Sequence, residues 1–159
     1  RTSARRHDRN GSNANAIATG EQRGCAVLEN DSVNWWGFNN KDQLGLVSTT
    51  RMGDGSGEMA VLPTVNLGTG RTATAIAAAR YHSCALLDNA SVKCWGRNNY
   101  GQLGIDNDTD MGKTSGSMAV LPSVNLGTGR TATAISAGVF HTCAMLDKEI
   151  GSASRRERG

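Results

Sequence analysis

The sequence predicts an all-β repeat protein, and three observations lead to this fold class. The segment from Met59 to Asp88 is identical to the segment from Met118 to Asp147 at 23 of 30 positions, at a constant offset of 59 residues. A third, more diverged copy begins at Gly11. Each copy contains short runs in which small and larger residues alternate between Gly-rich turns, a pattern typical of strands. A period near 59 leaves room for four short strands and one long loop.

Four strands are expected within one copy. Met59 to Leu67 is predicted to be an edge strand, because Pro63 donates no hydrogen bond to a ladder. Thr72 to Ala79 follows after a Gly-rich turn, and an amphipathic helix is the alternative here because the segment is rich in alanine. His82 to Leu87 and Ser91 to Trp95 are predicted to form a hairpin.

The turn of this hairpin has the same design in two copies. It is centred on Asn89, and the first copy has Asn30 at the equivalent place. Asn tolerates the positive φ that tight hairpin turns need, so these two residues are expected to adopt it.

Composition and charge indicate a lean globular protein with basic ends. The chain of 159 residues has a net charge of +3, and arginines cluster at both ends while the repeats are close to neutral. Residues 1–10 and 148–159 are expected to be solvated tails, and no aromatic residues interleave with the charges, so a nucleic-acid partner is not expected. There is no apolar run long enough for a membrane-spanning helix. The chain opens on Arg1 and stops inside a repeat, which favours a fragment of a longer protein.

One motif resembles a known family. HSCALLDNASVK, from His82, precedes CWGRNNYGQLG, which ends at Gly104; the first copy keeps WGFNNKDQLG, and the third keeps HTCAMLD. This set resembles the repeat of the regulator of chromosome condensation (RCC1) family. The resemblance implies a β-propeller of four-stranded antiparallel blades, seven in the complete family form. Here about two and a half repeats, at 11–45, 46–104 and 105–147, would form an incomplete ring.

The resemblance also assigns structural roles within the repeat. The glycine after each Trp is expected to let the chain turn, while the Trp and Leu side chains fill the space between neighbouring blades. Arg23 stands where the other copies have histidine, so the start of this hairpin is interpreted as degenerate. The signature residues are His82, His141, Trp36, Gly37, Trp95, Gly96, Gln43, Leu44, Gly45, Gln102, Leu103 and Gly104.

The cysteines suggest one disulfide. Cys84 and Cys94 would face each other on paired strands, so a bond between them is predicted in an oxidising compartment; the alternative is two small buried thiols. Cys25 faces Trp35 instead of a cysteine, and the partner position of Cys143 falls beyond the last repeated residue. C-x-x-C spacing is absent, so no zinc site is expected.

No catalytic, cofactor or metal site is predicted. His82 and His141 recur at the period, which favours a structural hydrogen bond between adjacent blades over proton transfer. The loop from Asp106 to Asp110 resembles the start of a calcium loop, but the acidic residue required further along is missing. The most variable stretches are the loops 47–58 and 105–117, where partner specificity is expected.

These observations favour a non-enzymatic protein-binding scaffold whose blade loops recognise another protein. Self-association that completes a propeller is a further expectation, because a partial ring leaves apolar faces open. Two alternatives remain. The first, implied by the family resemblance, is a guanine-nucleotide exchange factor for a Ran-like small GTPase; the second is an extracellular recognition or inhibitor module. The compartment would be extracellular if the disulfide forms, and cytoplasmic or nuclear otherwise.

Overall fold

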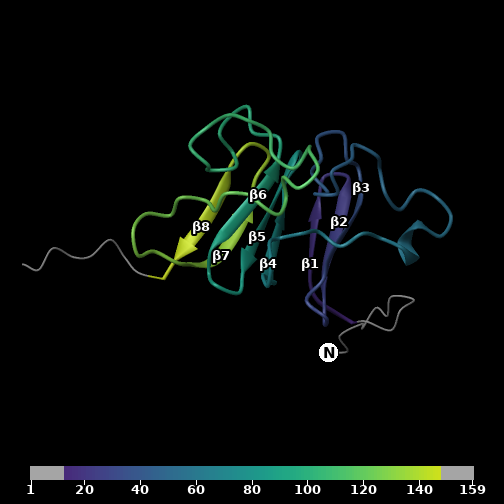
Figure 1. The fold of residues 1–159 in the computed structure, drawn as a ribbon, viewed down its shortest axis with the longest axis horizontal. Helices are drawn as coiled ribbons and strands as arrows, with labels where there is room; N and C mark the ends of the chain where they lie inside the picture. The colour runs from purple at the N-terminus through teal and green to yellow at the C-terminus, as the bar shows by residue number, and fades with distance from the viewer. Residues whose placement is uncertain (1–12, 148–159) are drawn as a thin grey trace, which may run out of the picture.

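The computed structural model describes residues 13–147, which form three small antiparallel sheets placed side by side (Figure 1). The predicted basic tails, 1–10 and 148–159, lie outside the described residues. We call the sheets blades 1, 2 and 3. Blade 1 comprises β1 (Ala14–Gly20), β2 (Arg23–Leu28) and β3 (Val33–Gly37); blade 2 comprises β4 (Ala73–Ala78), β5 (His82–Leu87) and β6 (Val92–Gly96); and blade 3 comprises β7 (Ala132–Ala137) and β8 (Thr142–Leu146).

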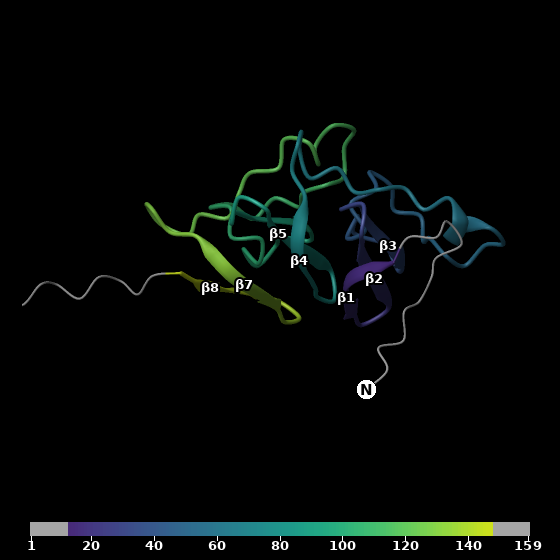
Figure 2. The same ribbon diagram turned by 90° about the horizontal axis from the view of Figure 1, so that it is seen from below.

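The blades follow one another in chain order. Strand β4 packs against β1 and β2 of blade 1, and β7 packs against β4 and β5 of blade 2. Figure 2 shows the three sheets in succession, with blades 1 and 3 at the two ends and no contact between them that would close a ring. The all-β, open propeller fragment that the sequence predicts is therefore confirmed. Among residues 13–147, no helix is long and apolar enough to cross a membrane.

The alanine-rich segment forms a strand and not the alternative helix. Ala73–Ala78 pairs antiparallel with β5, and small residues of β4 lie opposite larger ones, as Ala75 does with Leu86. The register shifts by one residue near the start of β4, and the same irregularity recurs in β1 and β7. Small side chains on the first strand allow the next blade to pack closely.

The predicted edge strand, Met59 to Leu67, is not a continuous strand. It begins within a short 3-10 helix, η1 (Glu58–Ala60), and only Thr64 forms an isolated bridge, with Asn34 of β3. Pro63 next to it has no N–H, so the ladder cannot extend in that direction. The predicted edge strand is thus reduced to a single bridge on the outer edge of the preceding blade. The other bridges join Gly37 to Met52, Lys93 to Ser123 and Gly96 to Met111.

The hairpin turns differ from the prediction by one residue. Positive φ occurs at Asp31 (63°) and Ala90 (62°), and not at Asn30 and Asn89. Instead, the Asn89 side-chain oxygen accepts hydrogen bonds from the backbone N and Oγ of Ser91, at 3.2 and 2.7 Å, and the first copy repeats both bonds. The asparagine therefore stabilises the turn through its side chain, an Asx turn, and leaves the left-handed position to its neighbour.

Candidate functional site

A buried arginine lies at the centre of the contact between blades 1 and 2. Arg23 is only 6% exposed, and its Nη1 donates to the Gln43 carbonyl oxygen and to Ser83 Oγ, both at 2.7 Å. Its Nη2 donates to the carbonyl oxygens of Ala79, at 2.7 Å, and His82. Burial lowers the pKa of Arg23 to about 9, so the guanidinium is charged at neutral pH. The interpretation of this hairpin start as degenerate is wrong, because Arg23 joins the two blades.

Indole rings complete this contact. Trp95 is fully buried, donates from Nε1 to the Gln43 carbonyl oxygen at 3.1 Å, and meets the Trp35 ring edge-on at 6.0 Å. Leu44 beside it is also fully buried. Trp36, the counterpart of Trp95 in the first copy, is only half-buried, because the described residues include no blade before blade 1.

The contact between blades 2 and 3 uses neutral groups instead. His82 is fully buried, and its Nε2 lies 2.9 Å from Thr142 Oγ1. Thr142 Oγ1 donates its one hydrogen to the Gln102 carbonyl oxygen at 2.8 Å, so Nε2 of His82 is the donor to Thr142. Burial, assisted by the positive charge of Arg23 and by His141, lowers the pKa of His82 to about 4. The imidazole is therefore neutral at physiological pH.

The glycine after each Trp is required by a close approach of the backbone. Gly37 and Gly96 have φ of 104° and 103°. A Cβ on Gly96 would lie 2.5 Å from the Tyr81 carbonyl oxygen, and one on Gly37 would lie 2.4 Å from that of Gln22. Any side chain at these positions would force the hairpin to open.

Two buried asparagines hold the segment that follows each Trp-Gly pair. Asn39 and Asn98 are fully buried, and their Oδ1 atoms accept from the backbone N of Leu44 and Leu103, each at 2.9 Å. This places the two leucines, which are fully buried, at the contacts between blades. The two asparagines were not predicted from the sequence, although their recurrence in both W-G-x-N segments was a usable signal.

The predicted cysteine pair lies at disulfide distance. Cys84 and Cys94 are directly opposite each other in the β5–β6 register, and their sulfurs are 2.11 Å apart. Cys25 is a buried free thiol, and burial raises its pKa to about 12. Cys143 is a free, exposed thiol. The three equivalent cysteines thus differ in both partner and accessibility.

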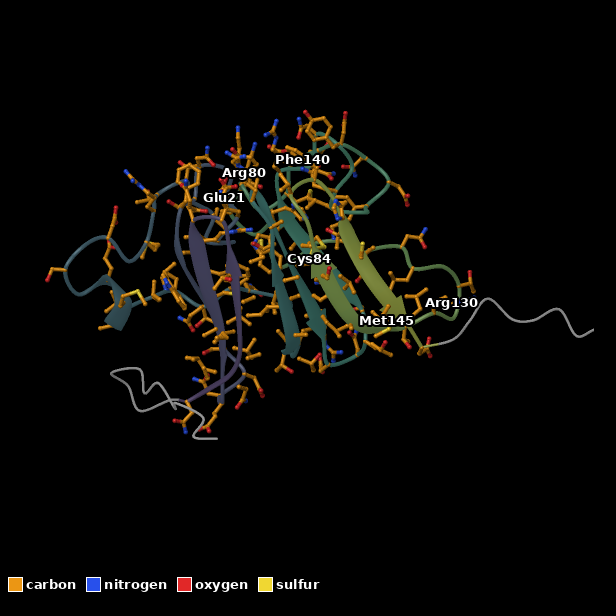
Figure 3. All side chains as sticks on the ribbon, turned by 180° about the vertical axis from the view of Figure 1, so that it is seen from behind. Glu21, Arg80, Cys84, Arg130, Phe140 and Met145 are labelled. Atoms are coloured by element: carbon orange, nitrogen blue, oxygen red, sulfur yellow. A yellow bond between two sulfur atoms is a disulfide. The ribbon has the colours of Figure 1, made fainter. Side chains whose placement is uncertain are left out.

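A row of arginine and aromatic side chains covers one end of blades 2 and 3; Figure 3 labels its two outer members, Arg80 and Phe140. The Arg80 and Arg97 guanidinium groups lie over the Tyr81 ring at 5.0 and 5.3 Å, and Arg97 also lies over Tyr100 at 5.7 Å. Tyr100 meets Phe140 edge-on at 5.1 Å. We call these five residues the Arg–aromatic row. The two rings at the blade 3 end of the row are exposed, Tyr100 by 65% and Phe140 by 46%.

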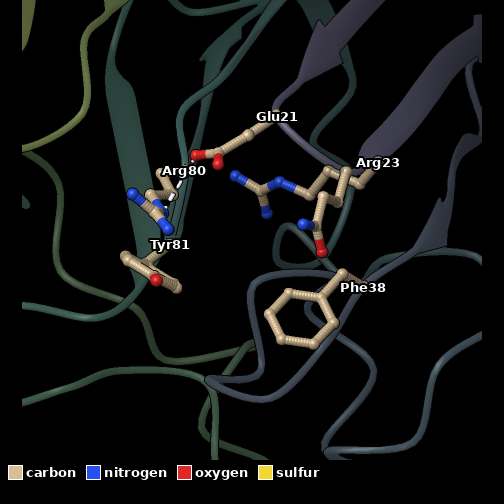
Figure 4. A pocket seen from close by; sticks show the side chains of 6 residues that line it. Glu21, Arg23, Phe38, Arg80 and Tyr81 are labelled. Atoms are coloured by element: carbon tan, nitrogen blue, oxygen red, sulfur yellow. Dashed lines mark ion pairs between the residues drawn. The ribbon is translucent and has the colours of Figure 1, made fainter.

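A small hollow extends this row towards blade 1 (Figure 4). Its volume is about 130 Å³, and its wall includes Arg23, Phe38 and Tyr81. Glu21 and Arg80 form an ion pair of 2.9 Å across it. The row and the hollow were not predicted from the sequence, because aromatic residues make up only 4% of the chain and their clustering depends on the packing of blades. The one available signal was the aromatic residue before each repeated histidine, Tyr81 and Phe140.

The two variable loops are held by carboxylates. Glu58 accepts from the backbone N of Gly55 and Gly53, at 2.9 and 2.7 Å, and these bonds lower its pKa. In the other loop Asp110 accepts from Lys113 Nζ at 2.6 Å and from a backbone N–H, which together lower its pKa although burial opposes them. In the acidic stretch that resembles a calcium loop, the Asp110 carboxylate therefore already accepts hydrogen bonds from within the chain. Within residues 13–147, no three His, Cys, Asp or Glu side chains are grouped as a metal site.

Comparison with known proteins adds matches to one repeat family over part of the chain, and solved structures with a similar fold. Two profiles described as "Regulator of chromosome condensation (RCC1) repeat" match residues 73–102 and 91–145. Yeast RCC1 (Prp20), solved bound to Kap60, is similar with a TM-score of 0.62 and 22% identity over 82% of this chain and 29% of its own. Human WBSCR16 is similar with a TM-score of 0.64 and 18% identity over 90% of this chain and 33% of its own.

A further structure, of Prp20p from Saccharomyces cerevisiae, was described together with its binding to Gsp1p and histones. It has a TM-score of 0.59 and 21% identity over 82% of this chain and 30% of its own. The chain therefore spans about a third of the length of these solved proteins. Because the identities are low, these similarities support the fold of a partial propeller.

Proposed function

Since residues 73–145 carry repeats of the RCC1 family, we propose that this chain is a non-enzymatic, protein-binding propeller scaffold that contacts its partner through the Arg–aromatic row and the adjoining loops. The row is the observation that carries the proposal. Tyr and Arg are enriched among the residues that dominate protein–protein binding energy, and Phe is enriched in the composition of interfaces. Here they form a continuous row at one end of the blades, in which Arg80, Tyr100 and Phe140 are exposed and the two residues between them are half-buried.

The geometry of the row suits a partner that presents carboxylates beside an apolar group. Arg97 is held between two tyrosine rings, so its orientation is fixed before binding. It forms no salt bridge among the described residues, whereas Arg80 is paired with Glu21. A carboxylate of the partner would be bound by Arg97, and the exposed edges of Tyr100 and Phe140 would cover apolar surface.

A matched pair of arginine substitutions tests this proposal. The partner is first identified by photo-crosslinking from position 100, and the affinity of the purified partner is then measured. Arg97→Ala and Tyr100→Ala are each expected to weaken binding about tenfold or more. Arg71→Ala is the control, because Arg71 is an exposed arginine that precedes β4, at the other end of the blade. Equal affinities for all three variants would contradict the proposal.

The variable loops are tested in the same assay. Exchanging residues 47–58 for residues 106–117, which are equivalent at the repeat offset, keeps the scaffold and changes only the loop. A change of partner or a loss of affinity is expected if the loops contribute specificity. Acceleration of nucleotide release from a Ran-like GTPase would instead favour the exchange-factor alternative.

A further inference from the structure

The contact between blades 1 and 2 shows what a complete blade places against its neighbour. The third strand of blade 2, β6, inserts Trp95 beside Leu44, and the indole donates to the Gln43 carbonyl oxygen. The indole lies so close that a Cβ on Gly45 would be 2.8 Å from its Nε1. One indole from a third strand therefore fills this space.

The next contact has the same acceptor and no indole. Gln102 and Leu103 of blade 2 occupy the equivalent positions, and Thr142 donates to the Gln102 carbonyl oxygen as Ser83 does to that of Gln43. The three atoms nearest to a Cβ on Gly104 would all belong to Val124. Residues 151–155, which are equivalent to β6 at the offset of 59, read Gly-Ser-Ala-Ser-Arg and contain no Trp. This part of the chain supplies no indole of its own.

A groove of about 460 Å³ is present where the indole would lie. Apolar side chains on its wall include Leu103, Val124, Phe140, Ala144 and Leu146. It adjoins the Arg–aromatic row, because Phe140 belongs to both. Within the described residues β8 pairs only with β7, whereas its counterpart β5 pairs on both sides, so the outer edge of β8 adjoins the groove with unpaired backbone groups.

We propose that this groove binds an extended segment of a partner protein that carries a Trp-Gly pair, added antiparallel to the free edge of β8. The Trp indole inserts beside Leu103, and its Nε1 donates to the Gln102 carbonyl oxygen. The Gly is required because its counterpart, Gly96, packs on the Tyr81 carbonyl oxygen, and Phe140 is the equivalent of Tyr81. Backbone pairing supplies affinity, and the indole supplies specificity.

This inference deepens the proposed scaffold function by naming a class of partner, and it rests on that function. A second copy of the chain is a poorer occupant, because its Trp95 is already fully buried and its half-buried Trp36 lies in β3, which is paired with β2. A separate segment with a free Trp-Gly pair has no such competing contact.

A synthetic peptide with the sequence of residues 91–97, with Ala at the position of Cys94, serves as the probe. Fluorescence anisotropy with a labelled peptide is expected to show saturable binding to the full chain. The peptide with Ala in place of Trp is expected to bind at least about tenfold more weakly, because the buried indole is lost. Equal binding of the two peptides, or none, would overturn the proposal.

Two protein variants locate the binding site. Ala144 faces the groove, so Ala144→Phe is expected to weaken peptide binding about tenfold or more. Met145 on the same strand is 63% exposed and is absent from the groove, so Met145→Phe is the matched control and should bind normally. Equal effects of the two substitutions would contradict the location.

The reaction of the exposed Cys143 thiol tests which residue of the bound peptide lies opposite Cys143 in β8. In blade 2 the residue before Trp95 lies opposite Cys84, and Cys143 is the equivalent of Cys84. A peptide with Cys at that position, activated as a thionitrobenzoate disulfide, is attacked by the Cys143 thiolate; a protein–peptide disulfide forms and thionitrobenzoate leaves. Release is expected to be at least about tenfold faster than with the peptide that lacks Trp. Equal rates of thionitrobenzoate release with the two peptides would contradict the proposed pairing of the peptide with β8.

These outcomes separate the two proposals. If the Trp-Gly peptide fails to bind while Arg97→Ala and Tyr100→Ala still weaken the natural partner, the groove proposal is wrong and the scaffold function stands. If none of these substitutions affects the natural partner, the proposed function fails independently of the peptide result.

Discussion

The two contacts between blades use the same backbone arrangement and different chemistry. Between blades 1 and 2, a charged Arg23 and the Trp95 indole converge on the Gln43 carbonyl oxygen. Between blades 2 and 3, Thr142 donates to the equivalent carbonyl oxygen of Gln102, and the neutral His82 donates to Thr142. The comparison teaches that both contacts keep a backbone acceptor and a hydroxyl donor at the same repeat position, Ser83 or Thr142, while the groups around this pair differ.

The largest expected effect is the loss of the indole from the first contact. Trp95→Ala should lower the free energy of unfolding by about 4 kcal/mol, because it removes a fully buried ring and leaves a cavity between two blades. Urea denaturation followed by circular dichroism measures the change. Trp36→Ala is the matched control, because Trp36 is only half-buried, and its effect should be clearly smaller. An equal loss of unfolding free energy in the two variants would show that the burial of Trp95 between blades adds no stability beyond that of Trp36.

The second prediction concerns the charged donor. Arg23→Ala should destabilise the chain by about 3 kcal/mol, because four hydrogen bonds from a charged group are lost and the Ala79 carbonyl oxygen is left without its donor. Arg80→Ala, at an exposed ion pair nearby, should change stability by less than about 1 kcal/mol. Hydrogen exchange should show faster opening of β2 in the Arg23 variant alone. A small effect of Arg23→Ala would mean that this contact depends on the indoles.

Residues that recur at the period were predictable, and residues that break it were not. The three paired strands of a copy, the Trp-Gly turns and the position of Cys84 opposite Cys94 follow from alternation and spacing within a copy. The strand predicted at Met59 to Leu67 was wrong, because only Thr64 forms a bridge there. Arg23 was misread because it differs from the histidine of the other copies, and its role depends on carbonyl oxygens brought near by packing. The Arg–aromatic row was missed for the same reason, since it joins residues of different blades.

The third prediction compares equivalent cysteines in the three blades. Reduction of the pair Cys84 and Cys94, or Ser at both positions, should lower stability by about 2.5 kcal/mol, because the bond closes a loop with a sequence separation of 10. Alkylation of native protein and peptide mapping should label Cys143, which is exposed. Cys25 should react slowly, because it is buried and its pKa is raised to about 12. Labelling of Cys84 and Cys94 in unreduced protein would exclude the bond.

The smallest predicted effect is a selective response of the second contact to acid. The pKa of His82 is about 4 in the folded chain and 6.5 is the ordinary value, so protons bind preferentially to the unfolded chain between these limits. The stabilisation is complete above pH 6.5 and is lost as the pH falls towards 4, by about 2 kcal/mol at pH 5. The first contact depends on Arg23, which stays charged throughout this range.

Hydrogen exchange at several pH values distinguishes the two contacts. Strands β7 and β8 should exchange faster at pH 5 than at pH 7 after correction for the intrinsic rates, while β2 and β3 change little. His82→Gln should remove this dependence, because the amide can donate to Thr142 and does not titrate. Thr142→Val should weaken the contact at both pH values and leave the acid response of His82 in place. An equal acid response in all three blades, retained in His82→Gln, would assign the effect to carboxylates elsewhere and not to the contact between blades 2 and 3.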